Sequence, residues 1–198
     1  MSSAYINRSI RDYVENLSRK QPSPGGGSAS ALVAALGAAL NVMLLQYNSA
    51  KEEPKRNKFT VLLEEQTVIL EELNSLVDKD CEVLDNLIGL IREKKATDES
   101  YAMAADIPKR VCELAFESLE ITAFAASVSK KIFVSDVLSA AQFLKAAFTA
   151  GEANVLVNLK YMSNRDNASK IQKELSGLRV RIDRLYGEVK EAIKGRSS

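Results

Sequence analysis

Apolar residues recur every three or four positions along nearly the whole chain. No segment shows the sustained alternation of apolar and polar residues that is expected of a strand. The clearest pattern lies between about 167 and about 194, where apolar residues are separated by alternating steps of four and three: Ile171, Leu175, Leu178, Ile182, Leu185, Val189 and Ile193. This stripe predicts an amphipathic helix that packs against a bundle or against a partner chain.

The same pattern predicts about six helices. Besides the last, we expect a short helix capped by Ser9, one from the glycines to about 47, and long helices at about 59–94, 98–129 and 135–162. Ser135 or Asp136 is expected to cap the fifth helix. Pro108 should kink or restart the fourth, because proline lacks a backbone donor and clashes with the preceding turn. The 198 residues therefore predict one all-α domain, residues 1–198, folded as an antiparallel bundle.

Charge and composition exclude several kinds of partner. The 27 basic and 26 acidic residues nearly cancel, and they form no basic block of the kind that follows a nucleic acid backbone. Residues 1–11 are polar and lack the apolar core of a signal peptide. The apolar run Ala29–Leu45 contains Ser30 and Asn41 and is shorter than the roughly 20 residues that a membrane span needs. We expect a cytoplasmic protein without nucleic acid or membrane partners.

The chain contains no histidine, which removes many kinds of catalytic site. Ser-His and Cys-His pairs, His-ligated zinc and Glu-x-x-His di-iron centres are excluded, and no metal site is expected. Cys81 and Cys112 have no metal-binding spacing and are interpreted as small core residues. Proton transfer in an enzyme of this composition must use Asp, Glu, Lys, Tyr or Cys.

One acidic residue interrupts the apolar stripe of the third helix, because Asp80 stands where a leucine is expected. The stripe consists of Leu62, Ile69, Leu73, Leu76, Leu84, Leu87 and Ile91. A carboxylate that faces a core either finds partners or has its pKa raised, since burial disfavours the charged form. Two interpretations stay open: an aspartate that pairs with Lys or Arg or caps another helix, and a group that transfers protons. Asp78 points away from the stripe and is expected to be solvated.

The fifth helix carries a second polar group, in which Gly151, Asn154 and Asn158 share one face among apolar neighbours. The two amides can bind the donors and acceptors of a heterocycle, with the glycine leaving room for it. An interhelical hydrogen-bonded pair in the core explains them equally well. The pocket interpretation predicts that Asn158→Leu weakens ligand binding without destabilising the protein.

A run of glycines and prolines, "PSPGGGS", precedes the alanine-rich second helix. Gly25, Gly26, Gly27 and Ser28 lie at a helix start, where free amides and the positive end of the dipole favour an anion. Glycines also let a ligand approach the backbone closely. The spacing is neither the Walker pattern nor the Gly-x-Gly-x-x-Gly fingerprint, and no strand precedes it. We expect an anion-accepting helix start, with close helix packing as the competing explanation.

Four of these elements together resemble the family of formiminotetrahydrofolate cyclodeaminases and methenyltetrahydrofolate cyclohydrolases. "PSPGGGSASALVAALGAAL" resembles its Pro-x-Pro-Gly-Gly-Gly-Ser opening and "LVDKD" its Val-Asp-x-Asp element. "VSDVLSAA" is similar to its Ser-Asp helix start and "NVLVNLK" to its Asn-Val-x-x-Asn-Leu signature. Order and spacing agree from about 10 to about 190. Two departures stand out: Glu52 follows Lys51 where a second basic residue is usual, and "KKIFV" replaces the Gly-Asn stretch before Ser135.

The resemblance implies a homodimer of helical bundles, with a folate pocket at or near the subunit interface. It implies that Asp80 is the catalytic acid and base, acting without a metal or redox cofactor. The substrate-binding candidates are Gly25, Gly26, Gly27, Ser28, Lys51, Ser135, Asp136, Asn154, Asn158 and Lys160.

Three functions remain open at this stage. The first is cyclodeamination of 5-formiminotetrahydrofolate to the 5,10-methenyl form and ammonia, which the intact Asp element favours by a small margin. The second is hydrolysis of 5,10-methenyltetrahydrofolate to the 10-formyl form. The third is a folate-binding protein that has lost its chemistry, an alternative motivated by Glu52. A helical adaptor without a ligand is disfavoured, because it would have no need of polar residues at core positions.

Overall fold

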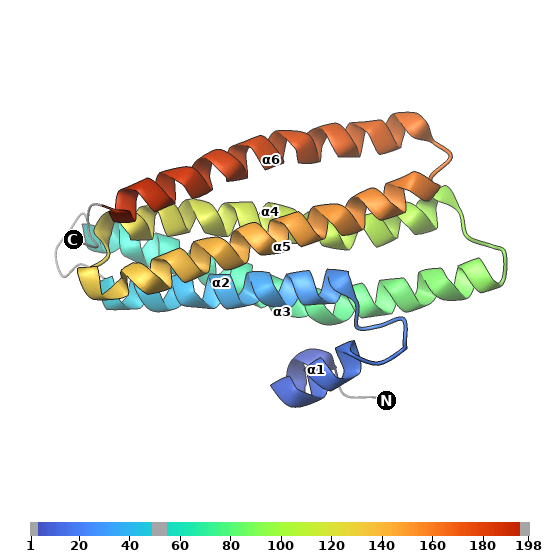
Figure 1. Ribbon diagram of the computed structural model, residues 1–198, viewed down its shortest axis with the longest axis horizontal. Coiled ribbons are helices and arrows are strands. Elements are labelled where there is room, and N and C mark those ends of the chain that lie inside the picture. Colours follow the sequence, from blue (N-terminus) through green and yellow to red (C-terminus); the bar gives the residue numbers. More distant parts are fainter. Residues whose placement is uncertain (1–3, 49–54, 195–198) are drawn as a thin grey trace.

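The computed structural model describes residues 4–48 and 55–194, and within these ranges every regular element is helical. The predicted all-α class is therefore confirmed. In chain order the elements are η1 (Tyr5–Asn7), α1 (Ile10–Leu17), α2 (Gly26–Asn48), α3 (Lys55–Arg92), α4 (Asp98–Val128), η2 (Lys131–Phe133), α5 (Val134–Tyr161) and α6 (Arg165–Lys194). The five long helices run alongside one another, and short α1 lies apart from them beside α2 and α3 (Figure 1).

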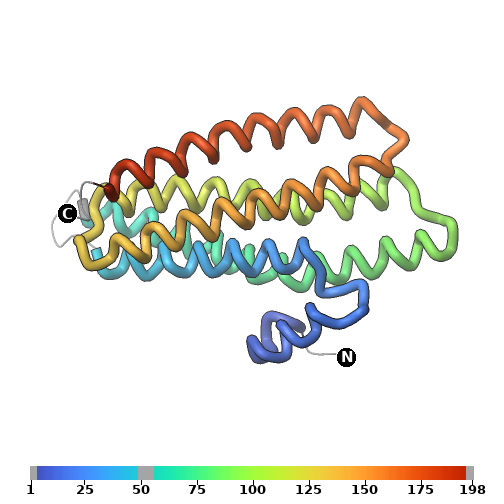
Figure 2. Tube along the Cα trace, in the orientation of Figure 1, coloured from blue at the N-terminus to red at the C-terminus, as the bar shows by residue number. Residues whose placement is uncertain are grey.

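The bundle has two neighbouring apolar cores, and α2, α4 and α5 each contribute residues to both. One fills the space between α4, α5 and α6, where Phe148 and Ile182 are completely buried. The other lies between α2, α3 and α4, around Leu73 and Val77. Helix α5 packs against α2, α4 and α6, whereas α6 contacts only α4 and α5 closely among the described helices. The path of the chain in Figure 2 shows α6 on the side of the bundle opposite α1. The pocket that Asp80 lines is built from α2, α3, α4 and α5.

A buried polar network fixes α2 against its neighbours. Asn41, in the middle of the apolar second helix, donates to the carbonyl oxygen of Ser118 at 2.8 Å and to the hydroxyl of Thr122 at 2.9 Å. Its side-chain oxygen accepts from Thr122 at 3.0 Å, and Gln66 on α3 accepts from Ser118 at 3.0 Å. All four residues are fully buried. Nε2 of Gln66 is the one buried side-chain nitrogen or oxygen without a partner among the described residues. The bonds that are made set the register of α2, α3 and α4.

Helix ends agree with the sequence in some places and differ in others. Ser9 accepts from the amide of Asp12, as predicted for a cap. The predicted cap of the fifth helix is wrong, because α5 already begins at Val134, after the 3₁₀ turn η2. Ser135 and Asp136 therefore lie within its first turn. The fourth helix continues through Pro108 without a restart.

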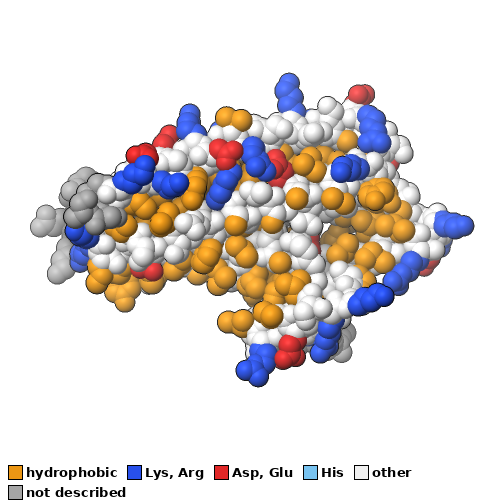
Figure 3. Space-filling view, in the orientation of Figure 1, with side chains coloured by type: hydrophobic (Ala, Val, Ile, Leu, Met, Phe, Trp, Pro, Cys, Tyr) orange, Lys and Arg blue, Asp and Glu red, His pale blue; other side chains and the backbone are white. Residues whose placement is uncertain are grey.

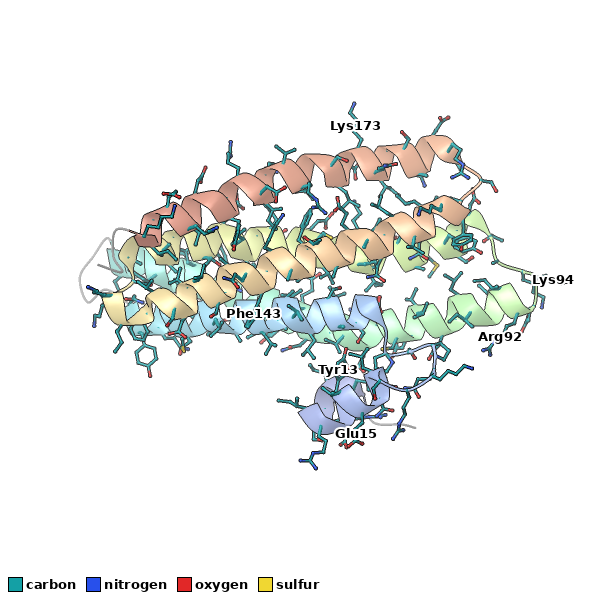
Figure 4. The ribbon with its side chains drawn as sticks, in the orientation of Figure 1. Tyr13, Glu15, Arg92, Lys94, Phe143 and Lys173 are labelled. Atoms are coloured by element: carbon teal, nitrogen blue, oxygen red, sulfur yellow. The ribbon has the colours of Figure 1, made fainter. Side chains whose placement is uncertain are left out.

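Two helical stretches, α2 and Lys131–Tyr161, are long and apolar enough in composition to cross a membrane. Of the apolar window of α2, 56% is buried inside the bundle, as in a core helix of a globular protein. The corresponding fraction for the second stretch is 33%, so α5 keeps much apolar surface on the outside. Phe143 projects from α5 beside α2 (Figure 4).

Candidate active site

Asp80 lies on α3 and faces the first turn of α2. Its side chain is 9% exposed, and the backbone N–H of Ser28 donates to the carboxylate. Burial raises the pKa of Asp80 from 3.8 to about 6, against the smaller opposing effect of that hydrogen bond. No ion pair with Lys or Arg is found for Asp80 among the described residues. The aspartate thus meets the start of another helix and also has the raised pKa of a proton-transfer group.

Gly27 makes this approach possible. A Cβ atom built on Gly27 would lie 2.5 Å from Cγ and 2.6 Å from Oδ2 of Asp80, closer than a real Cβ ever comes. Only glycine therefore allows the carboxylate to reach the amides of α2. The anion at this helix start is the side chain of Asp80 itself. The predicted anion-accepting helix start is thus explained by a group of the same chain, and Ser28 N–H is already engaged.

Gly26 and Gly25 have other neighbours. A Cβ on Gly26 would lie 3.1 Å from Nδ2 and 3.3 Å from Oδ1 of Asn154, so this glycine lets α2 begin directly against α5. A Cβ on Gly25 would make ordinary contacts with the carbonyl oxygen of Pro22 and with Leu84. The glycine run therefore fits the start of α2 between α3 and α5.

A pocket of about 50 Å³ lies in front of Asp80. Four helices contribute to its wall, which consists of Gly26, Gly27, Asp80, Val83, Leu84, Ala104, Pro108, Asn154 and Asn158. This volume holds one or two water molecules, at about 30 Å³ each, or a one-carbon unit. A second cavity of about 180 Å³ shares Val83 and continues between α3 and α4 to Met103. The surface is hollowed where α2 begins, below α5 (Figure 3).

Asn158 closes a gap in the hydrogen bonding of α4. Pro108 has no N–H, so the carbonyl of Ala104, four residues earlier, lacks its helical donor. The side-chain amide of Asn158 donates to that carbonyl at 3.1 Å, and also to the carbonyl of Asn154 at 3.1 Å. Asn154 donates to the carbonyl of Ala150 at 2.8 Å. Both asparagines line the pocket, and no hydrogen bond to either Oδ1 is found within the described part of the chain.

Gly151, the third member of the predicted face, serves the packing of α4. A Cβ there would lie 2.9 Å from Sγ of Cys112 and 3.0 Å from the carbonyl oxygen of Pro108. The expectation that Gly151 leaves room for a ligand is therefore wrong, since Cys112 and Pro108 occupy the space. Gly151 therefore serves packing between helices. Asn158 does so in part, because its amide bonds to α4 while its side chain also lines the pocket.

The remaining predicted site residues lie elsewhere in the chain. Ser135 and Asp136 are 18 or more residues from Asn154 on the same helix, roughly 27 Å away at 1.5 Å per residue. Lys160 is exposed and lines a separate cleft between α5 and α6, together with Arg165. Lys51 lies outside the described residues.

Three carboxylates of α3 hold the N-terminal segment. Asp78 accepts from the amides of Tyr5 and Ile6 and is half-buried, so the expectation that it is solvated is wrong. Asp85 accepts from the hydroxyl of Ser23 at 2.9 Å, and Asp80 accepts from Ser28. The sequence shows that these three carboxylates lie close together along α3. It does not show their partners, because these are more than 50 residues away in sequence.

The two cysteines behave as core residues. Both are free and buried, as the sequence predicts. Burial raises the pKa of Cys81 to about 11 and that of Cys112 to about 12, so both thiols are protonated at neutral pH. Among the titratable residues at the pocket, Asp80 is the one whose pKa lies near neutrality.

Fold and site together define an all-α bundle in which a buried carboxylate of raised pKa lines a small pocket. The family model described as formiminotransferase-cyclodeaminase matches residues 9–177. The chain therefore belongs to this family.

Individual relatives differ in length and in name. The chain is 27% identical to a methenyltetrahydrofolate cyclohydrolase of Methylorubrum extorquens over 96% of this chain and 98% of that protein. It is also 27% identical to the formimidoyltransferase-cyclodeaminase of Rattus norvegicus over 87% of this chain, but it spans only 34% of the rat protein. The crystal structure of formiminotetrahydrofolate cyclodeaminase from Thermotoga maritima superimposes with a TM-score of 0.84 at 24% identity, covering 96% of this chain and 97% of that one. That similarity concerns the fold.

Proposed function

We propose that the protein is a folate one-carbon enzyme that converts 5-formiminotetrahydrofolate to 5,10-methenyltetrahydrofolate and ammonia. The observation that carries this proposal is the position of Asp80, buried at the wall of a pocket with a pKa of about 6. A carboxylate with a pKa near the working pH can both accept and return a proton. Membership of the family supports tetrahydrofolate derivatives as the substrate class.

The reaction needs one proton to move between two nitrogen atoms. N10 of the substrate attacks the carbon of the protonated formimino group, and Asp80 takes the proton that N10 loses. The carbon–nitrogen bond to the former imino nitrogen then breaks, and Asp80 delivers its proton to that nitrogen, which leaves as ammonia. The product is the 5,10-methenyl cation. Asp80 returns to its ionised form, and the proposal requires no metal or redox cofactor.

A second candidate is the cyclohydrolase reaction. The relative from Methylorubrum extorquens, which matches this chain end to end, carries that name. In this reaction a water molecule attacks the methenyl carbon, and Asp80 takes a proton from the water. The bond from that carbon to N5 breaks as N5 receives this proton from Asp80. The remaining hydroxyl proton of the adduct is released to solvent as the formyl C=O forms, and 10-formyltetrahydrofolate is the product. The pocket beside Asp80 has room for the attacking water.

One assay distinguishes these candidates. Purified protein is given each substrate in turn, and the absorbance of the methenyl species is followed. Its appearance from 5-formiminotetrahydrofolate supports the deaminase, and accelerated loss of added methenyl species supports the hydrolase. Asp80→Asn is the control in both arms. If wild type turns over neither substrate but binds folates, the non-catalytic alternative replaces both proposals.

We further propose that the enzyme is a cytoplasmic homodimer that associates through α2 and α5. These helices lie side by side, and α2 contains no charged residue. The two helices carry exposed apolar side chains, namely Leu36, Ala39, Phe143, Ala146, Ala150, Ala153 and Val157. Of these, Ala146, Ala150 and Ala153 also line a shallow cleft with Tyr186 of α6. Exposed apolar surface of this extent is typical of an interface.

An antiparallel pairing of two α5 helices would also account for the distance between the predicted site residues. Ala146, small and exposed, lies midway between Asp136 and the Asn154–Asn158 pair. A twofold axis near Ala146 would therefore place Ser135 and Asp136 of a second copy beside the pocket. Ala146→Glu should yield a monomer in light scattering, whereas Ser176→Glu, on the exposed side of α6, should leave the mass unchanged. A dimer that persists in Ala146→Glu contradicts this interface.

A further inference from the structure

Helix α1 touches the bundle through a single buried side chain. Tyr13 is 5% exposed, whereas Ile10, Val14 and Leu17 on the same helix are 83%, 55% and 38% exposed. In Figure 4 Tyr13 points from α1 toward the bundle and Glu15 points away from it. Helix α1 thus reaches the interior through one side chain, and that side chain lies beside the start of α2.

The hydroxyl of Tyr13 meets the residue that binds the candidate catalytic carboxylate. Its oxygen lies 3.0 Å from Oγ of Ser28, in a buried contact. Ser28 is completely buried, so its hydroxyl cannot reach a substrate in the pocket, although its backbone N–H donates to Asp80. Tyr13, Ser28 and Asp80 therefore form a continuous line of contacts from α1 through α2 to α3.

We propose that Tyr13 is a positioning residue for Asp80. By holding the side chain of Ser28, it fixes the first turn of α2, so that the Ser28 N–H stays aimed at the carboxylate. This inference rests on the proposed function in assigning proton transfer to Asp80. It adds a residue of α1 that touches neither the pocket nor the carboxylate directly.

The residues before α2 are also held to α3 by contacts that do not involve Tyr13. Tyr13 can therefore be altered without loss of the fold. Tyr5 and Ile6 are held by Asp78, and Ser23 is held by Asp85. Tyr13→Phe keeps the ring in its apolar surroundings and removes only the hydroxyl. We therefore expect this variant to fold and to keep α1 in place.

The groups that surround Asp80 are mostly uncharged, which simplifies the interpretation of its titration. Tyr13 from α1 and Cys81 from α3 both have raised pKa values and stay neutral below pH 9. From α2, α4 and α5 the pocket presents only glycine, alanine, proline and asparagine. On α3, Asp78 and Asp85 are occupied by the amides of Tyr5 and Ile6 and by Ser23. Among the described residues, Asp80 is thus the one titratable residue that lines the pocket, and its own carboxyl resonance is the readout of its titration.

The test compares Tyr13→Phe with Tyr5→Phe. Tyr5 packs edge-on against Tyr13 and belongs to the same segment, but its hydroxyl donates to the carbonyl of Ser23 and not to Ser28. With the Ser28 turn released, the hydrogen bond to Asp80 weakens and its pKa should rise by about half a unit or more. We expect kcat to fall about tenfold with little change in KM, since positioning affects the proton-transfer step. Tyr5→Phe should keep the wild-type values.

One further measurement makes the outcome independent of turnover. The pKa of Asp80 is followed by NMR of its carboxyl carbon in wild type, Tyr13→Phe and Ser28→Ala. Ser28→Ala retains the backbone N–H but removes the contacts of its hydroxyl with both Tyr13 and Cys81. It should shift the pKa in the same direction, and adding Tyr13→Phe to it should shift the pKa no further. Wild-type pKa values in Tyr13→Phe overturn the positioning role even if the enzyme is active. A shifted pKa in a protein that turns over neither folate substrate supports the positioning and refutes the proposed function instead.

Discussion

Replacing Asp80 by asparagine should stabilise the protein while it removes the activity. The amide has nearly the same shape, and its Oδ1 can still accept the Ser28 N–H. The carboxylate pKa is raised from 3.8 to about 6 by burial. At 1.36 kcal/mol per pKa unit, keeping Asp80 ionised at pH 7 costs the folded state about 3 kcal/mol. Asp80→Asn is neutral and is spared this cost.

Whether stability rises or falls with pH is decided by which state, folded or unfolded, binds the proton on Asp80. Between pH 3.8 and 6 the folded protein holds a proton on Asp80 that the unfolded chain has released. Stability from this group therefore falls as pH rises through the window and is regained on acidification. From pH 7 to pH 5 the wild type should regain about 1.3 kcal/mol that Asp80→Asn does not regain.

Urea unfolding of both proteins at pH 5, 6 and 7 measures this difference, because all other titrating groups are common to the two. Asp80→Asn should be more stable at pH 7, and its advantage should shrink toward pH 5. Turnover should fall at least about a hundredfold, the low end for loss of a general acid–base group. A stability difference that does not change with pH would refute the raised pKa. A variant that is both less stable and less active would indicate a structural role.

Three further substitutions test the surroundings of the site. Gly27→Ala places a methyl group on Asp80, so turnover should fall by about a hundredfold or more and stability by about 1–3 kcal/mol, measured by assay and by urea unfolding. Gly177→Ala is the matched control: nothing lies within 4 Å of its Cβ, so it should raise stability by up to about 1 kcal/mol and leave turnover unchanged. Asn158→Leu leaves the carbonyl of Ala104 without a donor and should lower stability by about 1–3 kcal/mol, contrary to the expectation from sequence; an unchanged midpoint would refute this.

Periodicity was sufficient to predict the helices, because each buries a regular stripe and ends at a polar break. The differences lie at the ends. Ser135 has the right chemistry for a cap, but the turn Lys131–Phe133 starts the helix earlier, so Phe133 occupies the cap position without a side-chain bond. A short 3₁₀ turn leaves no period in a sequence. The sequence alone therefore could not show that this turn moves the start of α5.

Some residues that line the pocket could be singled out from the sequence, namely Gly26, Gly27, Asp80, Asn154 and Asn158, but their contacts could not. Asp80 was identified because it breaks an apolar stripe, and the glycine run because such runs permit close approach. Sequence could not show that the group approaching Gly27 is Asp80, since the two are 53 positions apart and the contact depends on how α2 docks on α3. Tyr13 had no distinguishing feature, because an aromatic residue on the apolar side of a short helix is ordinary core.

Four departures from regular helix packing meet at the pocket: the glycines that begin α2, the aspartate in the stripe of α3, Pro108 within α4 and Asn158 on α5. Each would be unfavourable alone. Together they are partly compensated, since Gly27 admits Asp80, Ser28 binds its carboxylate, and Asn158 satisfies the carbonyl that Pro108 leaves free. The charge of Asp80 is not compensated, because no cation pairs with it among the described residues. Sequences depart from local rules where function requires it. The uncompensated carboxylate is therefore the group on which we place the chemistry.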